Sequence, residues 1–240
     1  MKRERFQLRE TIVTIIAEKD VHIEAAKKEI QKCRNEIEQF IRKDRFFRIT
    51  FEPYKCSKDE PEIIRKMCKS SEKLNVGPMS TVAGIIAEQA VKAMISKGAH
   101  HAVVDNGGDI ALFSYKTLNV GIYKGKQSTG RFAFQVLPKN KIIGICTSSG
   151  KIGHSTSFGN TDAVVVISHN VSLADASATA LGNLVNTDED IKGAFKILDD
   201  IDEIIGAMII IDNKIGLWGD VPQIVRANVP YELITKGGAA

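Results

Sequence analysis

The chain has 240 residues, of which 43% are hydrophobic and 26% are charged, and its formal net charge is +4. This length can bury a sizeable core, and so mild a charge does not indicate a nucleic-acid-binding protein. The first residues, MKRERFQLRE, lack the apolar stretch of a secretory signal. The longest apolar run, EIIGAMIIID, falls far short of the roughly 20 residues that a membrane-spanning helix needs. We therefore expect a cytoplasmic protein with no membrane or nucleic-acid partner.

The first part of the chain predicts a strand or hairpin followed by three helices. Residues 6–18 are rich in Thr, Val and Ile, as strands are. A long amphipathic helix is predicted from Asp20, a second one buries Ile64, Met67 and Cys68, and a third covers residues 80–97. The expected inward positions of the long helix are Ala26, Ile30, Cys33, Ile37 and Phe40.

The second part of the chain predicts mostly strands. HAVVDNGGDIALF is typical of a strand, a tight turn and a second strand. Further strands are expected at residues 120–123, 131–137 and 141–147 and in DAVVVIS, with helices over 172–186 and 189–198 and a last hairpin that turns at Asp212-Asn213. Hairpins interrupted by helices indicate an α+β fold with a mainly antiparallel sheet, which we expect to form a single domain over residues 1–240.

The segment SLADASATALGNLV has two interpretations. Ser172 and Asp175 match the Ser/Thr-x-x-Asp/Glu capping box, in which the carboxylate only satisfies free amides of the first helical turn. Alternatively, Asp175 and Thr179 lie one turn apart on one face of a helix of small residues. A carboxylate and a hydroxyl at that spacing can both reach a hard cation such as Mg²⁺.

The segment VVDNGGDIAL also has two interpretations. Asn-Gly between strands is the strongest short hairpin signal, so the segment can be a simple turn. Alternatively, Gly107 and Gly108 let a ligand approach the backbone closely. Asp105, Asn106 and Asp109 would then be polar anchors for that ligand.

The polar segment GKIGHSTSFGNTDA is either a solvated connection between strands or a ligand loop. In the second interpretation His154 carries a proton or binds a ligand, because its charge can change near neutral pH. In and beside this segment, the hydroxyls that could hold phosphate or ribose oxygens are those of Ser148, Ser149, Ser155, Thr156 and Ser157.

In their order along the chain, TVAGIIAEQAV, DNGGDIAL, VGIYKG, CTSSGKIGH and LADASATAL resemble motifs of the ApbE family of flavin transferases. The resemblance covers about residues 80–185. It implies an ApbE-like fold, a flavin (FAD or FMN) as cofactor, and Mg²⁺ bound by Asp175, Thr179 and the backbone carbonyl near Val82. It also implies that His154 corresponds to the histidine of the catalytic region.

The chain departs from the family where Lys, Tyr and Asp of its helix motif are replaced by Ala83, Ile85 and Glu88. It is more similar to an uncharacterised cytoplasmic ApbE-like branch found largely in anaerobic archaea and bacteria. That branch is linked to sulfide assimilation into cysteine and homocysteine, which implies sulfur-assimilation proteins as partners.

The four cysteines form no C-x-x-C pair, which argues against structural zinc and a disulfide framework. Cys33 and Cys68 fall on apolar stripes and are predicted to be core residues. Cys56 lies in a polar stretch between two lysines, which favours its thiolate, and Cys146 ends a predicted strand. If one thiol carries sulfur as a persulfide, we expect it to be Cys56 or Cys146.

Three functions therefore remain open from the sequence. The first is an enzyme or binding protein for a flavin or another phosphate-bearing small molecule, with a divalent metal in a polar cleft. The second is a sulfur-handling protein that carries persulfide. The third is a non-catalytic subunit that keeps the fold and uses the cleft for a partner.

Overall fold

The computed structural model describes residues 1–123, 132–150, 159–227 and 235. Among these residues, no helix is long and apolar enough to cross a membrane. The strands are β1 (Lys2–Leu8), β2 (Thr11–Ala17), β3 (His101–Asn106), β4 (Asp109–Ser114), β5 (Leu118–Gly121), β6 (Phe132–Val136), β7 (Lys139–Ser148), β8 (Ala163–Ser168), β9 (Ile204–Ile211), β10 (Lys214–Gly219) and β11 (Gln223–Arg226). The helices are α1 (Asp20–Lys43), α2 (Phe46–Ile49), α3 (Glu62–Lys73), α4 (Val82–Ser96), α5 (Val171–Leu184) and α6 (Ile191–Ala194), with 3-10 turns η1 (Pro78–Thr81), η2 (Asp188–Asp190) and η3 (Phe195–Leu198).

An antiparallel sheet of eight strands forms the centre of the fold, in the order β1-β2-β3-β4-β7-β8-β9-β10. Strands β1–β2, β3–β4 and β9–β10 pair as hairpins. A smaller antiparallel sheet has the order β11-β6-β5, and two of its strands lie in the chain between β4 and β7. The predicted combination of helices with a mainly antiparallel sheet is confirmed.

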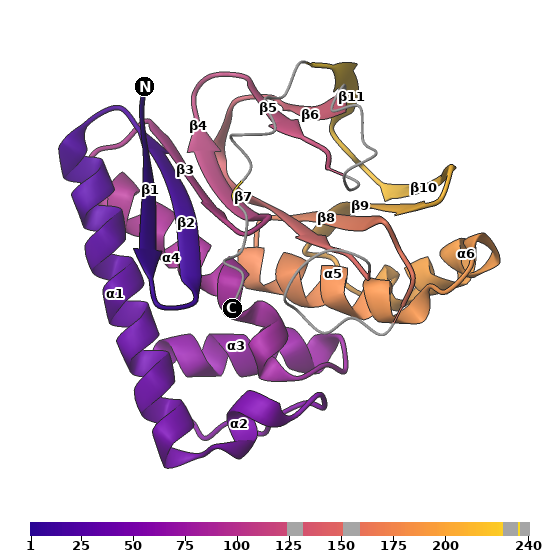
Figure 1. The fold of residues 1–240 in the computed structure, drawn as a ribbon, viewed down its shortest axis with the longest axis horizontal. Coiled ribbons are helices and arrows are strands. Elements are labelled where there is room, and N and C mark those ends of the chain that lie inside the picture. Colours follow the sequence, from indigo (N-terminus) through magenta and orange to yellow (C-terminus); the bar gives the residue numbers. More distant parts are fainter. Residues whose placement is uncertain (124–131, 151–158, 228–234, 236–240) are drawn as a thin grey trace.

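Strand β8 shows that the large sheet is covered on both faces. All 6 of its residues are buried. Val164 and Val166 belong to the core on the helix side, whereas Val165 and Ile167 belong to the core that includes the small sheet. Successive side chains of a strand point to opposite faces, so a continuous apolar run is typical of a strand covered on both sides. Figure 1 shows α4 and α5 on one face and β5, β6 and β11 on the other.

The helices bury the faces that their apolar spacing predicts. In α1 the buried positions include Ala26, Ile30, Cys33, Ile37 and Phe40. In α3 they include Ile64, Met67 and Cys68. Helix α4 packs against α1 and α5 as well as against the sheet, which places it at the centre of the helical layer.

Some boundaries differ from the prediction. The third helix begins as the 3-10 turn Pro78–Thr81, and its α-helical part starts only at Val82. Residues 188–198 are two 3-10 turns around one short α-helix. The sequence predicts neither α2 nor β11, because α2 has only 4 residues and β11 pairs with a strand far away in the chain.

Candidate functional site

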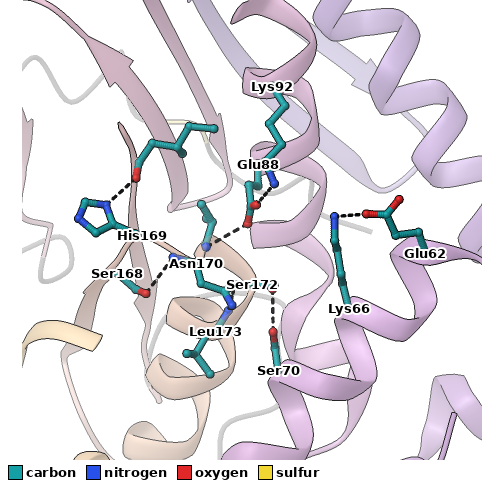
Figure 2. A network of polar contacts seen from close by, with 12 residues as sticks. Glu62, Lys66, Ser70, Glu88, Lys92, Ser168, His169, Asn170, Ser172 and Leu173 are labelled. Carbon is teal, nitrogen blue, oxygen red and sulfur yellow. Dashed lines mark hydrogen bonds and ion pairs between the residues drawn. The ribbon is translucent and has the colours of Figure 1, made fainter. Parts of the chain in front are cut away.

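A network of polar contacts holds the N-terminus of α5 (Figure 2). Asn170 caps the helix, since its Oδ1 accepts a hydrogen bond from the Leu173 amide at 3.2 Å. The Ser172 hydroxyl instead bonds with that of Ser70 on α3 at 2.8 Å. The predicted capping box of Ser172 and Asp175 is therefore wrong, because the cap residue is Asn170 and the Asp175 carboxylate has other partners.

Asp175 satisfies the N-terminus of α4 rather than that of its own helix. Its Oδ2 accepts a hydrogen bond from the Gly84 amide at 2.8 Å, and the Ala83 amide is a second donor. In return, Glu88 of α4 accepts a hydrogen bond from the Val171 amide at the start of α5 at 3.1 Å. Each helix thus supplies a carboxylate to free amides at the start of the other.

Gly84 allows this exchange because it leaves room between the two helices. A Cβ at this position would lie 2.7 Å from the Val171 carbonyl oxygen and 2.9 Å from the Asp175 Cβ. Both distances are too short for a real side chain, so α4 and α5 can approach this closely only at glycine. Sequence reasoning missed Gly84, although an isolated glycine inside a helical pattern is a known sign of a packing or functional role.

The β3–β4 turn lies against the same end of α4. Asn106 and Asp109 pair across a two-residue loop, and Gly107 and Gly108 have φ of +70° and +107°. Positive φ at both central residues is typical of the type I′ hairpin turn, so the predicted tight turn is confirmed. Asn106 is buried, and its Nδ2 donates a hydrogen bond to the Ala83 carbonyl at 3.1 Å. The turn is therefore fixed to the start of α4.

Three carboxyl groups with raised pKa values meet near this turn. Burial raises the pKa of Asp175 well above its usual value, and the Asp109 charge raises it further. Burial raises the pKa of Asp109 to about 7, with Asp105 adding to the effect. Burial also raises the pKa of Asp105. Asp105 and Asp109 keep some surface at solvent, but protein atoms surround their carboxylates closely enough to disfavour the charged forms.

The other predicted cation ligands belong to helices α4 and α5. Thr179 lies one turn after Asp175 and is partly exposed, and Val82 is the first residue of α4. Across the part of the chain that the structure describes, no group of three or more His, Cys, Asp or Glu side chains is arranged to hold a metal ion. A cation here would therefore need hydroxyl or carbonyl oxygens in addition to carboxylates, a ligand set that suits Mg²⁺ better than zinc.

The predicted ligand loop follows β7, and its described ends pack near α5. Ser148 is buried at the end of β7, and the Ser149 hydroxyl and the Gly150 amide both donate to the Thr161 carbonyl, at 3.4 Å and 3.1 Å. The Asn160 amide donates to the Val185 carbonyl just beyond α5 at 2.9 Å. His154, Ser155, Thr156 and Ser157 fall outside the described residues, so their roles stay predictions.

Cys146 and Cys56 have very different surroundings. Cys146 is fully buried, donates a hydrogen bond to the Val171 carbonyl at 3.5 Å and hydrogen-bonds to the Asp109 carboxylate. Burial and the nearby carboxylates raise the pKa of its thiol well above the usual value, which disfavours a reactive thiolate. Cys56 is partly exposed, so of the two it is the thiol that solvent reaches.

A cavity of about 410 Å³ lies away from the carboxylates. Its lining includes Ile95, His100, Phe113 and Tyr115, which come from the end of α4, the start of β3 and the end of β4. The cavity therefore lies at the opposite end of the β3–β4 hairpin from the Asn106–Asp109 turn, and it is distinct from the predicted site.

Comparison with known proteins identifies the family of this chain. A sequence profile described as AbpE bacteria matches residues 1–210. A UPF0280 protein of Methanosarcina barkeri is 48% identical over 235 residues, which cover 98% of this chain and 93% of that protein. A UPF0280 protein of Methanothrix thermoacetophila is 49% identical over 238 residues, which cover 99% of this chain and all of that protein.

Solved structures share the fold at low sequence identity. A mutant form of the flavin transferase ApbE from Vibrio cholerae has a TM-score of 0.58 and 14% identity, covering 90% of this chain and 96% of that one. The apo flavinyl transferase ApbE of Pseudomonas stutzeri has a TM-score of 0.58 and 14% identity, covering 99% and 98%. The predicted ApbE-like fold is confirmed.

Proposed function

Because the chain belongs to the AbpE bacteria family and shares its fold with ApbE flavin transferases, we propose that it binds a flavin or another phosphate-bearing small molecule together with a divalent cation. The binding site would lie between the Asn106–Asp109 turn, the segment that follows β7, and the Asp175–Thr179 face of α5. The solved ApbE proteins are flavin transferases by name, and transfer of a flavin group by this chain is not part of the proposal.

One observation carries the proposal, namely the buried Asp175 carboxylate beside Asp109. The two groups that lower the pKa of Asp175 are the backbone amides of Ala83 and Gly84, which do not outweigh burial and the Asp109 charge. Two carboxylates that share a poorly solvated site resist ionisation, and a divalent cation between them reverses this effect. The arrangement is therefore unfavourable for the empty protein at neutral pH and favourable for a cation complex.

The surrounding residues fit such a complex. Asp175, the Thr179 hydroxyl and the Val82 carbonyl would hold the cation, which when bound supplies positive charge against phosphate oxygens. Gly107 and Gly108 carry no side chain that would keep a ligand from the backbone. Ser148, Ser149, Ser155 and Thr156 would donate to phosphate or ribose oxygens, and His154 would hold or transfer a proton.

The proposal is tested by titrating the full chain with FAD, FMN and AMP, with and without Mg²⁺, by flavin fluorescence and calorimetry. Asp175→Asn keeps an acceptor oxygen for the two amides of α4 but removes the charge. Asp190→Asn is the matched control, because that carboxylate also accepts two backbone amides but is partly exposed. We expect Mg²⁺-dependent binding in the wild type and the control, and its loss in Asp175→Asn.

Equal binding by Asp175→Asn and the wild type would contradict the cation site. If neither the wild type nor either variant bound any of the ligands, the whole proposal would be contradicted. The alternative of a non-catalytic subunit would then be favoured. Circular dichroism of each variant separates lost binding from lost folding.

A second candidate function is the transport of sulfur as a persulfide, and the partial exposure of Cys56 favours it over Cys146 as the carrier. A polysulfide would donate one sulfur atom to the Cys56 thiolate and leave as a shorter polysulfide. Mass spectrometry after treatment with polysulfide should then find a gain of one sulfur on Cys56. No gain on any of the four cysteines would exclude this function.

A further inference from the structure

The cavity of about 410 Å³ beside the end of α4 lies where the pairing of β4 with β7 is irregular. Ser114 pairs with Lys139, whereas the neighbouring pair of Leu112 with Ile143 would align it with Lys141 in a regular ladder. Such bulges redirect side chains and are common next to functional sites. Lys141 lies within this irregularity, and it lines the cavity.

Three ring side chains also line the cavity, and they contact one another. The centroid of the Tyr115 ring lies 5.2 Å from that of His100 and 5.3 Å from that of Phe113. Phe113 is only 6% exposed, whereas Tyr115 is 51% exposed. Part of the Tyr115 ring is therefore accessible in the cavity, where it offers a flat apolar surface to a ligand.

Hydrogen bonds fix the residues around this ring. The Tyr115 hydroxyl donates to the Asn140 side-chain oxygen at 3.3 Å, and the Tyr115 amide donates to the His100 carbonyl at 3.2 Å. On β7, the carbonyl of Ile142, which is another lining residue, accepts a hydrogen bond from the His169 ring at 2.8 Å. A ligand would meet a surface that is already ordered, which lowers the entropic cost of binding.

The charged side chains around the cavity are mainly basic. Lys141 lines it, while Lys97 and Lys116 are next to lining residues in the chain, and all three are exposed. Among the described residues, the lining includes no Asp or Glu side chain. Glu18 accepts a hydrogen bond from the His100 amide at 3.1 Å, but it lies outside the lining. A recess surrounded by charge of one sign attracts ligands of the opposite sign.

We propose that this cavity binds a small planar aromatic anion with one ring or two fused rings. The aromatic part would contact Tyr115 and Phe113, and the anionic group would lie near the Lys141 ammonium. The volume is in the range typical of small-molecule sites. The cavity lies at the opposite end of the β3–β4 hairpin from the Asn106–Asp109 turn, so the proposal does not depend on flavin or cation binding.

The test is calorimetric titration of the full chain with benzoate and indole-3-acetate in buffer that contains EDTA. The chelator removes divalent cations, so the carboxylate site does not contribute. Indole-3-acetamide is the matched neutral ligand, because it has the same ring and no charge. We expect indole-3-acetate to bind about fivefold more tightly than the amide, since a charged group pairs with Lys141 only in the acid.

Three variants assign this binding to the cavity. Tyr115→Ala should weaken the binding of both indole ligands about tenfold, whereas Tyr115→Phe keeps the ring and should bind them like the wild type. Lys141→Gln should lower the affinity for the acid to that for the amide. Lys139→Gln is its matched control, because Lys139 is an exposed lysine of the same strand that does not line this cavity.

The proposal would be overturned if neither acid bound to the wild type, or if acid and amide bound equally well. It would also be overturned if Lys139→Gln lost as much affinity for the acid as Lys141→Gln, because the lysines would then act only through the general charge of the surface. Circular dichroism shows whether Tyr115→Ala is folded. If it is not, the two lysine variants decide the outcome, since both replace exposed side chains.

Discussion

Asp175 and Asp190 make the same kind of hydrogen bond in two very different environments. Asp175 accepts the amides of Ala83 and Gly84 inside the protein, where burial and Asp109 raise its pKa. Asp190 accepts two amides just after α5, at 3.0 Å and 2.9 Å, on the surface, where these bonds lower its pKa. The hydrogen bonds alone therefore do not decide whether a carboxylate is stable in its charged form, because solvation and nearby charge do.

The comparison also separates a structural role from a functional one. A surface cap needs only a water-accessible carboxylate, and Asp190 fulfils that role in a short capping box. A buried aspartate beside a second aspartate is an unfavourable choice of helix cap, because burying its charge costs free energy. An uncharged acceptor would satisfy the same amides without that cost. We infer that the charge of Asp175 serves the proposed cation.

The largest effect is expected at Gly84, on which the approach of α4 to Asp175 depends. Gly84→Ala places a Cβ 2.7 Å from the Val171 carbonyl oxygen, so one helix must move. We expect a loss of about 3 kcal/mol in the free energy of unfolding, the upper end of the usual range for overpacking, because the clash is with backbone. Urea denaturation measures it, together with a weaker response of the melting temperature to Mg²⁺.

Gly193→Ala is the matched control for Gly84→Ala. Gly193 lies in α6, and a Cβ there would meet no atom within 4 Å. Alanine should therefore leave stability unchanged or raise it by up to about 1 kcal/mol through helix propensity. Equal losses from the two substitutions would show that the contact between α4 and α5 is not special.

The next effect is expected from removing the Asp175 side chain. Asp175→Ala leaves the amides of Ala83 and Gly84 without their side-chain acceptor, which costs about 2 kcal/mol for unsatisfied buried donors. Asp175→Asn keeps an acceptor and removes the charge, so without metal it should be as stable as the wild type or more stable at neutral pH. Denaturant midpoints at an unchanged slope measure both variants. If Asp175→Asn lost as much stability as Asp175→Ala, the charge of Asp175 itself would stabilise the metal-free protein.

The dependence of stability on pH is the third test. The pKa of Asp109 is raised to about 7 in the folded protein, so the folded state binds more protons than the unfolded state from about pH 4 upward. The metal-free protein should therefore lose stability as the pH rises to about 7. We expect a loss of about 2 kcal/mol, less than the full shift implies because Asp109 keeps some exposed surface.

Mg²⁺ should reverse this dependence, because a cation competes with protons for the same carboxylates. The increase in melting temperature with Mg²⁺ should be larger at pH 8 than at pH 5, and Asp175→Asn should show little increase at either pH. A Mg²⁺ effect that is equal at both pH values would indicate binding at groups that do not titrate in this range.

Features encoded by neighbouring residues were predictable from the sequence. The Asn106–Asp109 turn follows from Asn-Gly-Gly between two apolar runs, and the buried face of α1 follows from its helical spacing. The apolar run of β8 likewise indicated a strand, and the structure shows that it is buried on both faces. In each case the local pattern and the tertiary packing favour the same structure.

The partners of the buried carboxylates were not predictable, because they lie far apart in the chain. Asp175 and Gly84 are 91 residues apart, and Glu88 and Val171 are 83 residues apart. The local pattern even favoured a wrong partner, since Ser172 and Asp175 have the spacing of a capping box while Asn170 is the cap. Cys68 was correctly predicted to be buried, because its position follows from the apolar spacing of α3.

The smallest effect on stability is expected at Asp190. Its contribution to stability changes with pH in the opposite direction to that of Asp109. Its folded-state pKa is lowered by the amides of Thr187 and Asn186. Its contribution to stability is therefore present above the unfolded pKa and is lost as the pH falls through the folded pKa. Asp190→Ala should lower the melting temperature at pH 7 by less than Asp175→Ala does, because water can replace the lost acceptor at a partly exposed site. Melting curves from pH 3 to pH 8 should show the wild type and Asp190→Ala converging in acid, with the same response to Mg²⁺ at neutral pH. If Asp190→Ala instead lost the Mg²⁺ response, the difference in burial between the two aspartates would not explain their roles.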